Sequence, residues 1–446
     1  MRGDASARRL ASAGLLIAAS LILLGGASRI FAQDEKAPSA PYASIARDGE
    51  SYAGPGRESS FDLTERVLSI GLLVPLHGPE KADGDGIVAA AQMALKDASQ
   101  RPMPGGRRLA LAIGDESGPS WGLVSDVVMH LVFDQDAVAL IASTSGTDAH
   151  LSEQVGNRIG VPVLTLSADA TTTQIDIPWV FRPGPSDVLQ AQGIARNIYR
   201  DRGLKRVLLV TERNHDGQRG DEAVRQAAPS LGAPPPDGLI LDPLQPDLHS
   251  VLARMQAQPE QAVVLWTSAE VAGELVQSLD AAGVRAPIYL SQQAAQAGSH
   301  VEFLPANEAA AAANGAVGRA VDEAANGATD GAEANEVKPG GIWTVSADGN
   351  DEAAARSFAL RYRQLTGMLP SPTAAEAYDA VCLTVQALRA AGPNRARVRD
   401  QLARVRDFRG ASGTISFDRE GNDPTPIHLV RVEEQRRSKA AEEATK

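Results

Sequence analysis

The sequence predicts an α/β protein built on parallel sheets. Leu68–Leu76 is an almost continuous apolar run, as expected for a strand that helices cover on both faces. A glycine-rich turn ends the run, and apolar residues then recur at helical spacing from Ile87 to Ala98. Apolar runs alternate with helical patterns along most of the remaining chain. We therefore expect repeated strand–helix–strand units and parallel sheets.

The expected elements follow one another regularly up to residue 290. After the first strand, strands are expected at Leu109–Ile113, Ala137–Ala142, Val161–Leu166, Arg206–Thr211, Gly238–Leu241, Ala262–Trp266 and Pro287–Leu290. Helices are expected at Ser120–Phe133, Thr147–Ile159, Asp187–Arg202, Gly217–Leu231, Asp247–Gln256 and Ala269–Ala282. Gly160 and Gly283 directly follow two of these patterns and are typical residues at helix C-terminal ends. Since these units are too numerous for one small sheet, we expect the chain to cross between two lobes at Pro183–Pro185.

The last third of the chain is less regular. Residues 293–340 are dominated by Ala, Gly, Asn, Glu and Asp, a composition typical of a long surface insertion, with a functional lid as the alternative. Later elements are then expected as a strand, three helices and a hairpin-like pair of strands, at Gly341–Ser346, Asp351–Thr366, Pro372–Ala391, Asn394–Val405, Gly413–Phe417 and Ile427–Val432.

Composition and motifs exclude several classes of function. The formal net charge is −12 and no basic stripe is present, which argues against a nucleic-acid surface. The single cysteine, Cys382, excludes an intrachain disulfide, and its position on an apolar helix predicts a small buried residue. The sequence contains no paired-histidine metal spacing, no nucleophile elbow and no phosphate loop. We therefore expect no enzyme activity, no metal site and no cofactor.

The N-terminus has the order of a secretory signal. Arg8 and Arg9 precede the apolar run Leu10–Leu24, and small residues follow. We expect cleavage after Ala27 or Ala32 and a periplasmic or secreted protein. An uncleaved membrane anchor is the alternative, although the apolar run is short for a membrane span.

Several phrases, in the right order, resemble the leucine/isoleucine/valine-binding family of type I periplasmic binding proteins. These phrases are IGLLVPLHGP, WVFRPGPSD, TERNHDGQRG, AEAYDAV and FRGASGTISFDREG. The resemblance implies two doubly wound parallel-sheet lobes joined by three crossovers, with one ligand held in the cleft between the lobes. Binding of that ligand to both lobes would favour a closed state.

The resemblance also implies a division of the chain. Residues 1–32 would be the signal peptide and residues 33–65 a disordered leader. Residues 66–184 and 294–408 would form lobe 1, with a flexible insertion at about 305–340. Residues 185–293 and 409–433 would form lobe 2, followed by a charged tail at 434–446.

Alignment to the family's motif implies a set of ligand contacts in the loops that follow the strands. In lobe 1 these are His77, Asp83, Ser143, Thr144, Ser145, Ser167, Ala168 and Asp169; from lobe 2 they are Asp216, Ser268 and Gln292. In amino-acid binders of the family, a hydroxyl and backbone N–H groups in the lobe 1 loops hold the ligand α-carboxylate, which here assigns Ser145 and the Ala168 N–H. Each serine could instead be an ordinary loop cap.

The amino-acid signature of the family is altered. Asp169 stands where threonine is common, and Asp216 replaces the usual tyrosine. With Asp83, these residues suggest an acidic cleft for a cationic or polyhydroxylated ligand; solvated loop carboxylates are the alternative. Trp121, Trp266 and Trp343 could stack on a ligand or fill a hinge or core. Tyr378 and Asp379 match the late-helix motif and are expected to be structural.

The function expected from this resemblance is extracytoplasmic solute binding. A monomeric protein would capture a small polar ligand, such as an amino acid, an amide or a cationic or polyhydroxylated solute, and deliver it to an ABC permease. The alternative is a module on the same fold that senses a ligand or docks on a protein, as an amide-type sensor or an activator of a cell-wall enzyme.

Overall fold

The first sheet is built around the apolar run that starts at residue 67. The computed structural model describes residues 46–47, 51–52, 54–118, 120–173, 179–296, 341–347 and 352–432. All of them belong to one compact unit that begins at Ile45. The sheet has the order β4-β3-β5-β6-β7 and every pairing in it is parallel. Its strands are β3 (Val67–Val74), β4 (Arg108–Asp115), β5 (Ala137–Ala142), β6 (Val163–Thr165) and β7 (Val180–Phe181).

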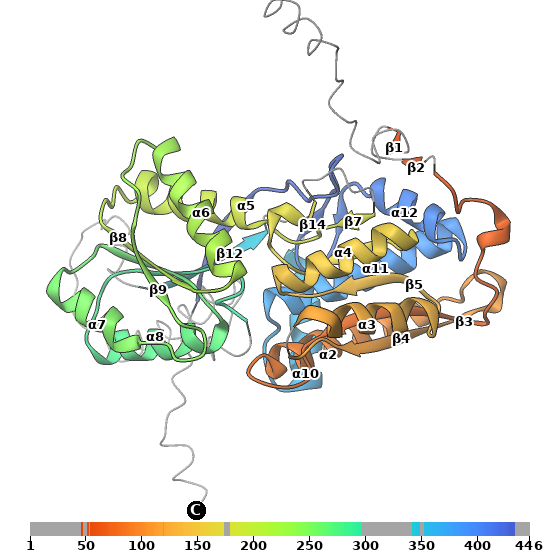
Figure 1. Ribbon diagram of the computed structural model, residues 1–446, viewed down its shortest axis with the longest axis horizontal. Helices are drawn as coiled ribbons and strands as arrows, with labels where there is room; N and C mark the ends of the chain where they lie inside the picture. Colours follow the sequence, from red (N-terminus) through yellow and green to blue (C-terminus); the bar gives the residue numbers. More distant parts are fainter. Residues whose placement is uncertain are drawn as a thin grey trace, which may run out of the picture. The chain divides into compact units, whose positions relative to one another are not determined.

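Helices cover both faces of this sheet (Figure 1). Leu68, Ile70 and Leu72 of β3 pack in one core cluster with side chains of α2 and α11, whereas Leu73 packs in another with side chains of α3 and α4. Successive side chains of a strand point to opposite faces, so burial on both faces explains why the run shows no polar alternation. The helices are α2 (Lys81–Ser99), α3 (Ser120–Phe133), α4 (Gly146–Ile159) and α11 (Pro372–Ala391).

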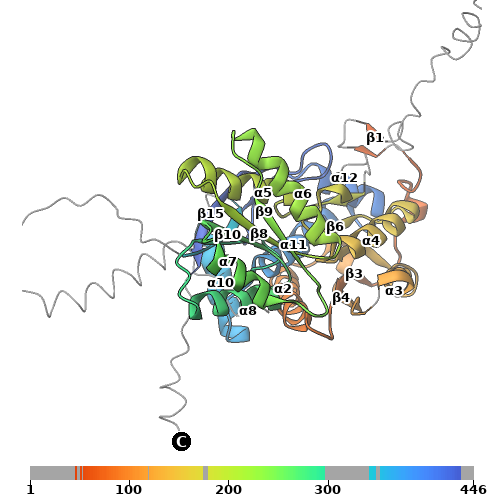
Figure 2. The same ribbon diagram turned by 60° about the vertical axis from the view of Figure 1, so that its left-hand side comes forward.

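The second sheet repeats the pattern and ends in an antiparallel strand. Its order is β15-β12-β11-β10-β8-β9, with β15 antiparallel to β12 and the other pairs parallel. Helices α5 and α6 cover one face and α7 and α8 the other (Figure 2). The strands are β8 (Val207–Glu212), β9 (Asp237–Leu241), β10 (Ala262–Trp266), β11 (Ile288–Leu290), β12 (Ile342–Ala347) and β15 (Ile427–Val432). The helices are α5 (Asp187–Ala195), α6 (His215–Ser230), α7 (Leu248–Ala257) and α8 (Ala269–Ala281).

The chain passes between the two sheets three times, as expected, but two crossovers differ from the predicted division. β12 pairs with β11 and β15 of the second sheet, so assigning all of residues 294–408 to lobe 1 was wrong for this strand. The second crossover therefore lies between β12 and α10 (Glu352–Thr366), and the third between β14 (Thr414–Ile415) and β15. Ile415 packs in the core of the first sheet, so assigning it to lobe 2 with residues 409–433 was also wrong. The remaining lobe boundaries stay a prediction.

Two local expectations were also wrong. Gly413–Phe417 does not pair with Ile427–Val432; β14 instead forms a small hairpin with β13 (Phe408–Arg409), since β15 is taken by β12. The leader is not disordered throughout to residue 65. β2 (Ser51–Tyr52) pairs with β1 (Ala46–Arg47), and the buried Tyr52 ring lies edge-on to Trp179, with ring centroids 4.7 Å apart.

The N-terminal segment is held by α12 (Arg395–Ala403). The Tyr52 N–H donates to Asp400 Oδ1 at 2.7 Å, and Asn394 Nδ2 donates to the Gly56 carbonyl at 2.9 Å. Residues 59–61, 104–106 and 170–172 form short 3₁₀ turns, and α5 continues as a π-helical segment over 196–201.

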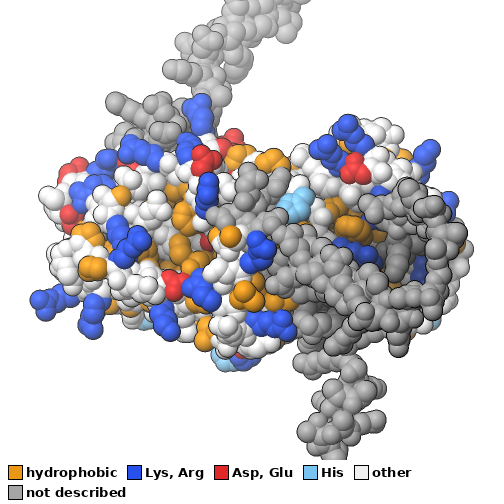
Figure 3. All heavy atoms as spheres, turned by 180° about the vertical axis from the view of Figure 1, so that it is seen from behind, with side chains coloured by type: hydrophobic (Ala, Val, Ile, Leu, Met, Phe, Trp, Pro, Cys, Tyr) orange, Lys and Arg blue, Asp and Glu red, His pale blue; other side chains and the backbone are white. Residues whose placement is uncertain are grey.

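The predicted signal peptide, the greater part of the insertion and the charged tail lie outside the described residues. Within the described ranges, no helix is both long and apolar enough to cross a membrane. Lys and Arg side chains are scattered over the face seen in Figure 3 and do not form a stripe.

Candidate functional site

The candidate site begins at the point where the order of the first sheet reverses. β4 and β5 flank β3 on opposite sides, so the chain leaves β3 and β5 in different directions and opens a crevice at their carboxyl ends. The loop after β5 leads directly into α4, whose N-cap Ser145 accepts a hydrogen bond from the Asp148 N–H. Ser143 has a φ of 46°, a left-handed conformation that turns the chain sharply at this edge.

A cavity at this edge is lined from both sheets. Its empty volume, including the open mouth, is about 790 Å³. Around it lie Pro79, Glu80, Asp83, Thr144, Leu166, Ala168, Asp169, Asp187, Gln190, Asp216, Arg219, Trp266, Ser268, Ala269, Glu270, Ser291, Gln292, Gln293, Gln296 and Thr373. The loops after β3, β5 and β6 supply one side, and the loops after β8, β10 and β11 supply the other. Residues far apart in the chain therefore meet here because strand ends converge.

The structure brings most of the predicted site residues to this cavity. Those lining it are Asp83, Thr144, Ala168, Asp169, Asp216, Ser268 and Gln292. Four others are not in the lining: His77, Ser143, Ser145 and Ser167.

Those four residues have local structural contacts. The imidazole of His77 is exposed and its Nδ1 lies 2.7 Å from Asp115 Oδ2. Ser143 and Ser145 stabilise the turn before α4, and Ser167 Oγ accepts a hydrogen bond from the Asp169 N–H at 3.2 Å. Their assignment as ligand contacts stays a prediction.

The cavity lining carries more carboxyl groups than basic groups. The carboxylates among the lining residues are Glu80, Asp83, Asp169, Asp187, Asp216 and Glu270, whereas the basic side chain in that set is Arg219. Burial raises the pKa of Glu80, Asp187 and Asp216, and the carboxylates that are ionised attract cations and repel anions.

Asp216 occupies a position that matters for ligand chemistry. Its Oδ1 accepts a hydrogen bond of 2.9 Å from the Gly146 N–H at the start of α4. A Cβ on Gly146 would lie only 2.5 Å from the same oxygen, so glycine permits the approach. Free N–H groups at a helix N-terminus are natural anion sites, and this one is taken by a carboxylate of the protein itself. Burial raises the pKa of Asp216.

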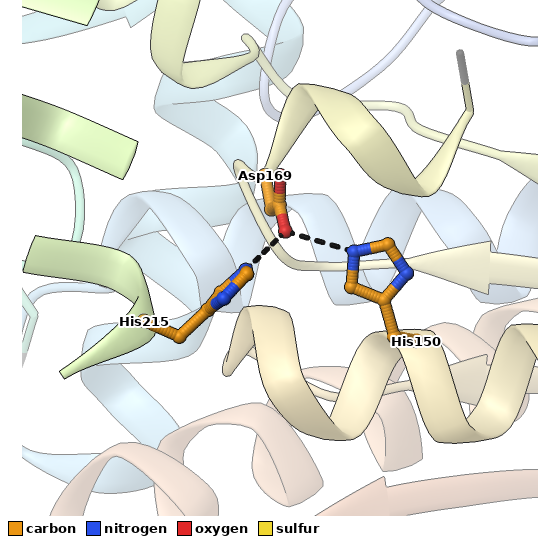
Figure 4. Close-up of side chains that lie close together, drawn as sticks. All are labelled: His150, Asp169 and His215. Atoms are coloured by element: carbon orange, nitrogen blue, oxygen red, sulfur yellow. Dashed lines mark hydrogen bonds and ion pairs between the residues drawn. The ribbon is translucent and has the colours of Figure 1, made fainter. Parts of the chain in front are cut away.

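A second cluster is centred on the buried carboxylate of Asp169, just before the 3₁₀ turn at 170–172 (Figure 4). The Nε2 atoms of His150 on α4 and His215 on α6 lie 3.1 Å and 2.6 Å from Asp169 Oδ2. Burial alone would raise the pKa of Asp169, but hydrogen bonds from His150, His215 and Thr171 hold this pKa below its usual range. Hydrogen bonds to Asp169 and Glu153 raise the pKa of His150 to about 9.

Two arginines complete the surroundings of Asp169. Arg219 Nε lies 3.5 Å from Asp169 Oδ1 and 3.6 Å from Asp187 Oδ2. The guanidinium of Arg182 is buried and donates to the carbonyls of Ser167 and Asp169. Arg182 thus fixes the loop that presents Asp169, while Arg219 reaches the same carboxylate from α6.

A polar chain links the second-sheet loop to α11. The Gln292 N–H donates to Gln190 Oε1 at 2.9 Å, and its side chain Nε2 donates to Glu376 Oε1. Burial is the main cause that raises the pKa of Glu376 to about 8. At neutral pH this buried carboxyl is therefore largely protonated.

Sequence reasoning missed several of the surrounding residues. Asp187, Gln190 and Arg219 lie near the starts of α5 and α6, where the sequence does not distinguish a polar residue that lines a cavity from one that faces solvent. His150 and His215 lie 19 and 46 residues from Asp169, so no spacing rule joins them. Trp266 lines the cavity, whereas the side chain of Trp121 is outside the described part of the structure.

Residues 67–439 match the family model for periplasmic binding proteins. The chain belongs to the periplasmic binding protein family. Among curated proteins, no sequence matches the chain. The match covers both sheets and the candidate cavity, and it confirms the resemblance that the sequence phrases indicated.

Solved structures show the same fold at low sequence identity. The branched-chain amino acid transporter substrate-binding protein LivJ from Streptococcus pneumoniae, in complex with isoleucine, has a TM-score of 0.65 and 20% identity, covering 82% of this chain and 99% of that one. The leucine-binding protein LivK from Thermotoga maritima has a TM-score of 0.64 and 16% identity, covering 81% and 94%. A solute-binding protein of an ABC transporter from R. palustris, in complex with benzoate, has a TM-score of 0.66 and 18% identity, covering 82% and 93%. These similar structures are solute-binding proteins, and the type I two-lobed fold of this chain is confirmed.

Proposed function

We propose that this protein is the extracytoplasmic solute-binding component of an ABC-type uptake transporter. It captures a small polar solute in the cavity between the two sheets and delivers it to a permease. The observation that supports this proposal is the cavity itself, because loops from both sheets line it. A solute that contacts both sides binds the closed arrangement more tightly than an open one, so binding drives closure.

The solute we propose is cationic or polyhydroxylated. Acidic side chains outnumber basic ones among the cavity-lining residues, and a cation gains electrostatic stabilisation in such a site. An aliphatic amino acid is a poor fit, because Asp216 accepts from the Gly146 N–H. The α-carboxylate would have to displace Asp216 and then lie beside Asp169.

The test is a thermal-shift panel on the purified chain with polyamines, guanidino compounds, sugars, amides and aliphatic amino acids. A ligand that binds only the folded state raises the melting temperature. At a concentration of 100 times its Kd, such a ligand adds about 2.7 kcal/mol to the free energy of unfolding. We expect the largest increase with a cationic compound. Tight binding of leucine or isoleucine, with no response to cations, would contradict the proposed solute class.

A second candidate function is a sensing or docking module on the same fold. It is favoured by the hydrogen bond between Asp216 and Gly146, since that bond fills an anion site without any solute. The same panel separates the two functions. If no compound shifts the melting temperature, and small-angle scattering gives the same radius of gyration with and without each compound, docking is favoured over transport.

A further inference from the structure

We propose that His150, Asp169 and His215 bind a divalent transition-metal ion, Zn²⁺ being the best match, and that this ion joins the two lobes. The three side chains each offer one ligand atom, and these atoms all lie within 4.8 Å of one another. His150 and Asp169 belong to elements of the first sheet, and His215 opens α6 on the second (Figure 4). The proposal goes beyond solute binding and does not depend on it.

The separations already approach those of a tetrahedral site. Zinc bonds to imidazole nitrogen and carboxylate oxygen of about 2.0–2.1 Å place neighbouring ligand atoms roughly 3.3 Å apart. The two nitrogens lie 3.1 Å and 2.6 Å from Asp169 Oδ2. All three ligand atoms lie within 4.8 Å of one another, so side-chain shifts on the order of 1–1.5 Å would bring them to tetrahedral separations. The imidazoles are 28% and 36% exposed, which leaves a route from solvent.

The hydrogen bond on the far side of His150 points the correct nitrogen at the site. His150 Nδ1 lies 2.9 Å from Glu153 Oε2. In the metal-free chain the hydrogen on His150 Nε2 faces Asp169 Oδ2 and Thr171 Oγ1, which lies 2.9 Å from this nitrogen. Zn²⁺ would replace that proton, while Nδ1 keeps its hydrogen and donates it to Glu153. A carboxylate behind a ligating histidine is the usual outer-shell arrangement of zinc sites.

Asp169 is oriented in the same way. The Thr171 N–H and Oγ donate to Asp169 Oδ1 at 2.9 Å and 2.7 Å, which leaves Oδ2 for the ion. Arg219 approaches the Oδ1 side at 3.5 Å and also contacts Glu222 at 2.5 Å. The basic side chain therefore does not occupy the space between the three ligand atoms.

The donor set selects the class of metal. Two imidazoles and one carboxylate suit Zn²⁺ and neighbouring transition metals, whereas Ca²⁺ and Mg²⁺ prefer all-oxygen sites. Three protein ligands leave a fourth position for water or for a coordinating group of a bound solute. Since the ligands come from both lobes, the ion would bind the closed arrangement more tightly than the open one and favour closure.

The test is calorimetric titration of Zn²⁺ into the full purified chain, after chelator treatment and in a buffer that does not bind zinc. We expect a single Zn²⁺ ion per chain. His150→Gln and His215→Gln each remove one ligand and should weaken binding by about 100-fold, and Glu153→Gln should weaken it by about 10-fold. Ca²⁺ at the same concentration should not bind.

His130→Gln is the matched control, because His130 is an exposed imidazole on α3 that pairs with Asp134. Its zinc affinity should equal that of the wild type. Co²⁺ gives a second measurement: the wild type should show the visible absorption of tetrahedral cobalt, and His215→Gln should not. Absence of saturable zinc binding, or equal affinity in His215→Gln and the wild type, would overturn the proposal. Glu153→Gln keeps all three ligands and so tests the site even if a ligand variant does not fold.

Discussion

At the scale of single residues, Asp216 has the greatest consequence for solute choice. Its carboxyl oxygen accepts from the Gly146 N–H, so the protein itself supplies an acceptor at a helix N-terminus where a ligand anion would bind. The sequence showed that aspartate stands where the resemblance implies tyrosine. It could not show where this carboxylate goes, because the partner lies 70 residues away on another lobe.

We predict that Asp216→Ala allows ligands with an α-carboxylate to bind. The substitution frees the Gly146 N–H for the ligand α-carboxylate, and a hydrogen bond to that charged group contributes about 1.5–3 kcal/mol. Affinity for leucine, measured by calorimetric titration, should rise about tenfold or more. Asp221→Ala is the control, since Asp221 lies on the same helix and pairs with Arg225 at 2.8 Å. Equal leucine affinity in the two variants would contradict the prediction.

At the scale of elements, the junction of β3 with α2 depends on close backbone contact. A Cβ on Gly84 would lie 1.7 Å from the Pro75 carbonyl oxygen. Only glycine therefore allows the first turn of α2 to pack on the end of the strand. This contact fixes Asp83 and Glu80 at the cavity.

We predict that Gly84→Ala lowers the free energy of unfolding by about 2 kcal/mol or more, since the overlap is with backbone and cannot be relieved by a rotamer change. Urea unfolding measures it. Asp85→Ala, at the exposed neighbouring position, should cost at most about 0.5 kcal/mol through loss of its pair with Lys81. If both variants lose a similar amount of unfolding free energy, the loss comes from substitution in the helix in general and not from the contact between Gly84 and Pro75.

Strands could be predicted from the sequence wherever both of their faces are buried, because such strands appear as continuous apolar runs. Ala137–Ala142 and Ala262–Trp266 are apolar runs with the same bounds as β5 and β10, because both faces of each strand are covered. β7 was missed since two residues carry no periodicity. The predicted pairing of β15 with Gly413–Phe417 was wrong. Strand pairing within a lobe depends on the order of strands in the sheet, which local sequence does not encode. The loops at strand ends could be predicted because each directly follows an apolar run. The cluster of His150, Asp169 and His215 could not, because its residues meet only through the arrangement of the two sheets.

At the scale of the whole molecule, the two lobes share a buried ionisable contact. Gln292 follows β11 of the second sheet, and its amide donates to Glu376 on α11, which packs on the first sheet. Glu376 is 3% exposed, and burial raises its pKa to about 8. As the pH rises, the folded chain therefore retains a proton on Glu376 that the unfolded chain releases near the ordinary glutamate pKa of 4.5.

We predict that the contribution of the Glu376 carboxyl to the free energy of unfolding is fully present below pH 4.5 and is lost as the pH rises toward 8. Glu376→Gln mimics the protonated form, so its free energy of unfolding relative to the wild type should increase with pH, by at most about 1.4 kcal/mol per pH unit. Urea unfolding between pH 5 and about pH 8 measures the difference. Glu274→Gln, exposed on α8, should show no trend. A constant difference for Glu376→Gln across this range would refute the assignment.

The pairing of β15 with β12 has a consequence for how the chain acquires its structure. Neither lobe is contiguous: α11 completes the first core although it follows β12, and Ile427 and Leu429 of β15 complete a core of the second. A chain emerging from the ribosome therefore lacks part of both cores until its final segment is available. Neither lobe can therefore reach its full stability before the last part of the chain has been synthesised.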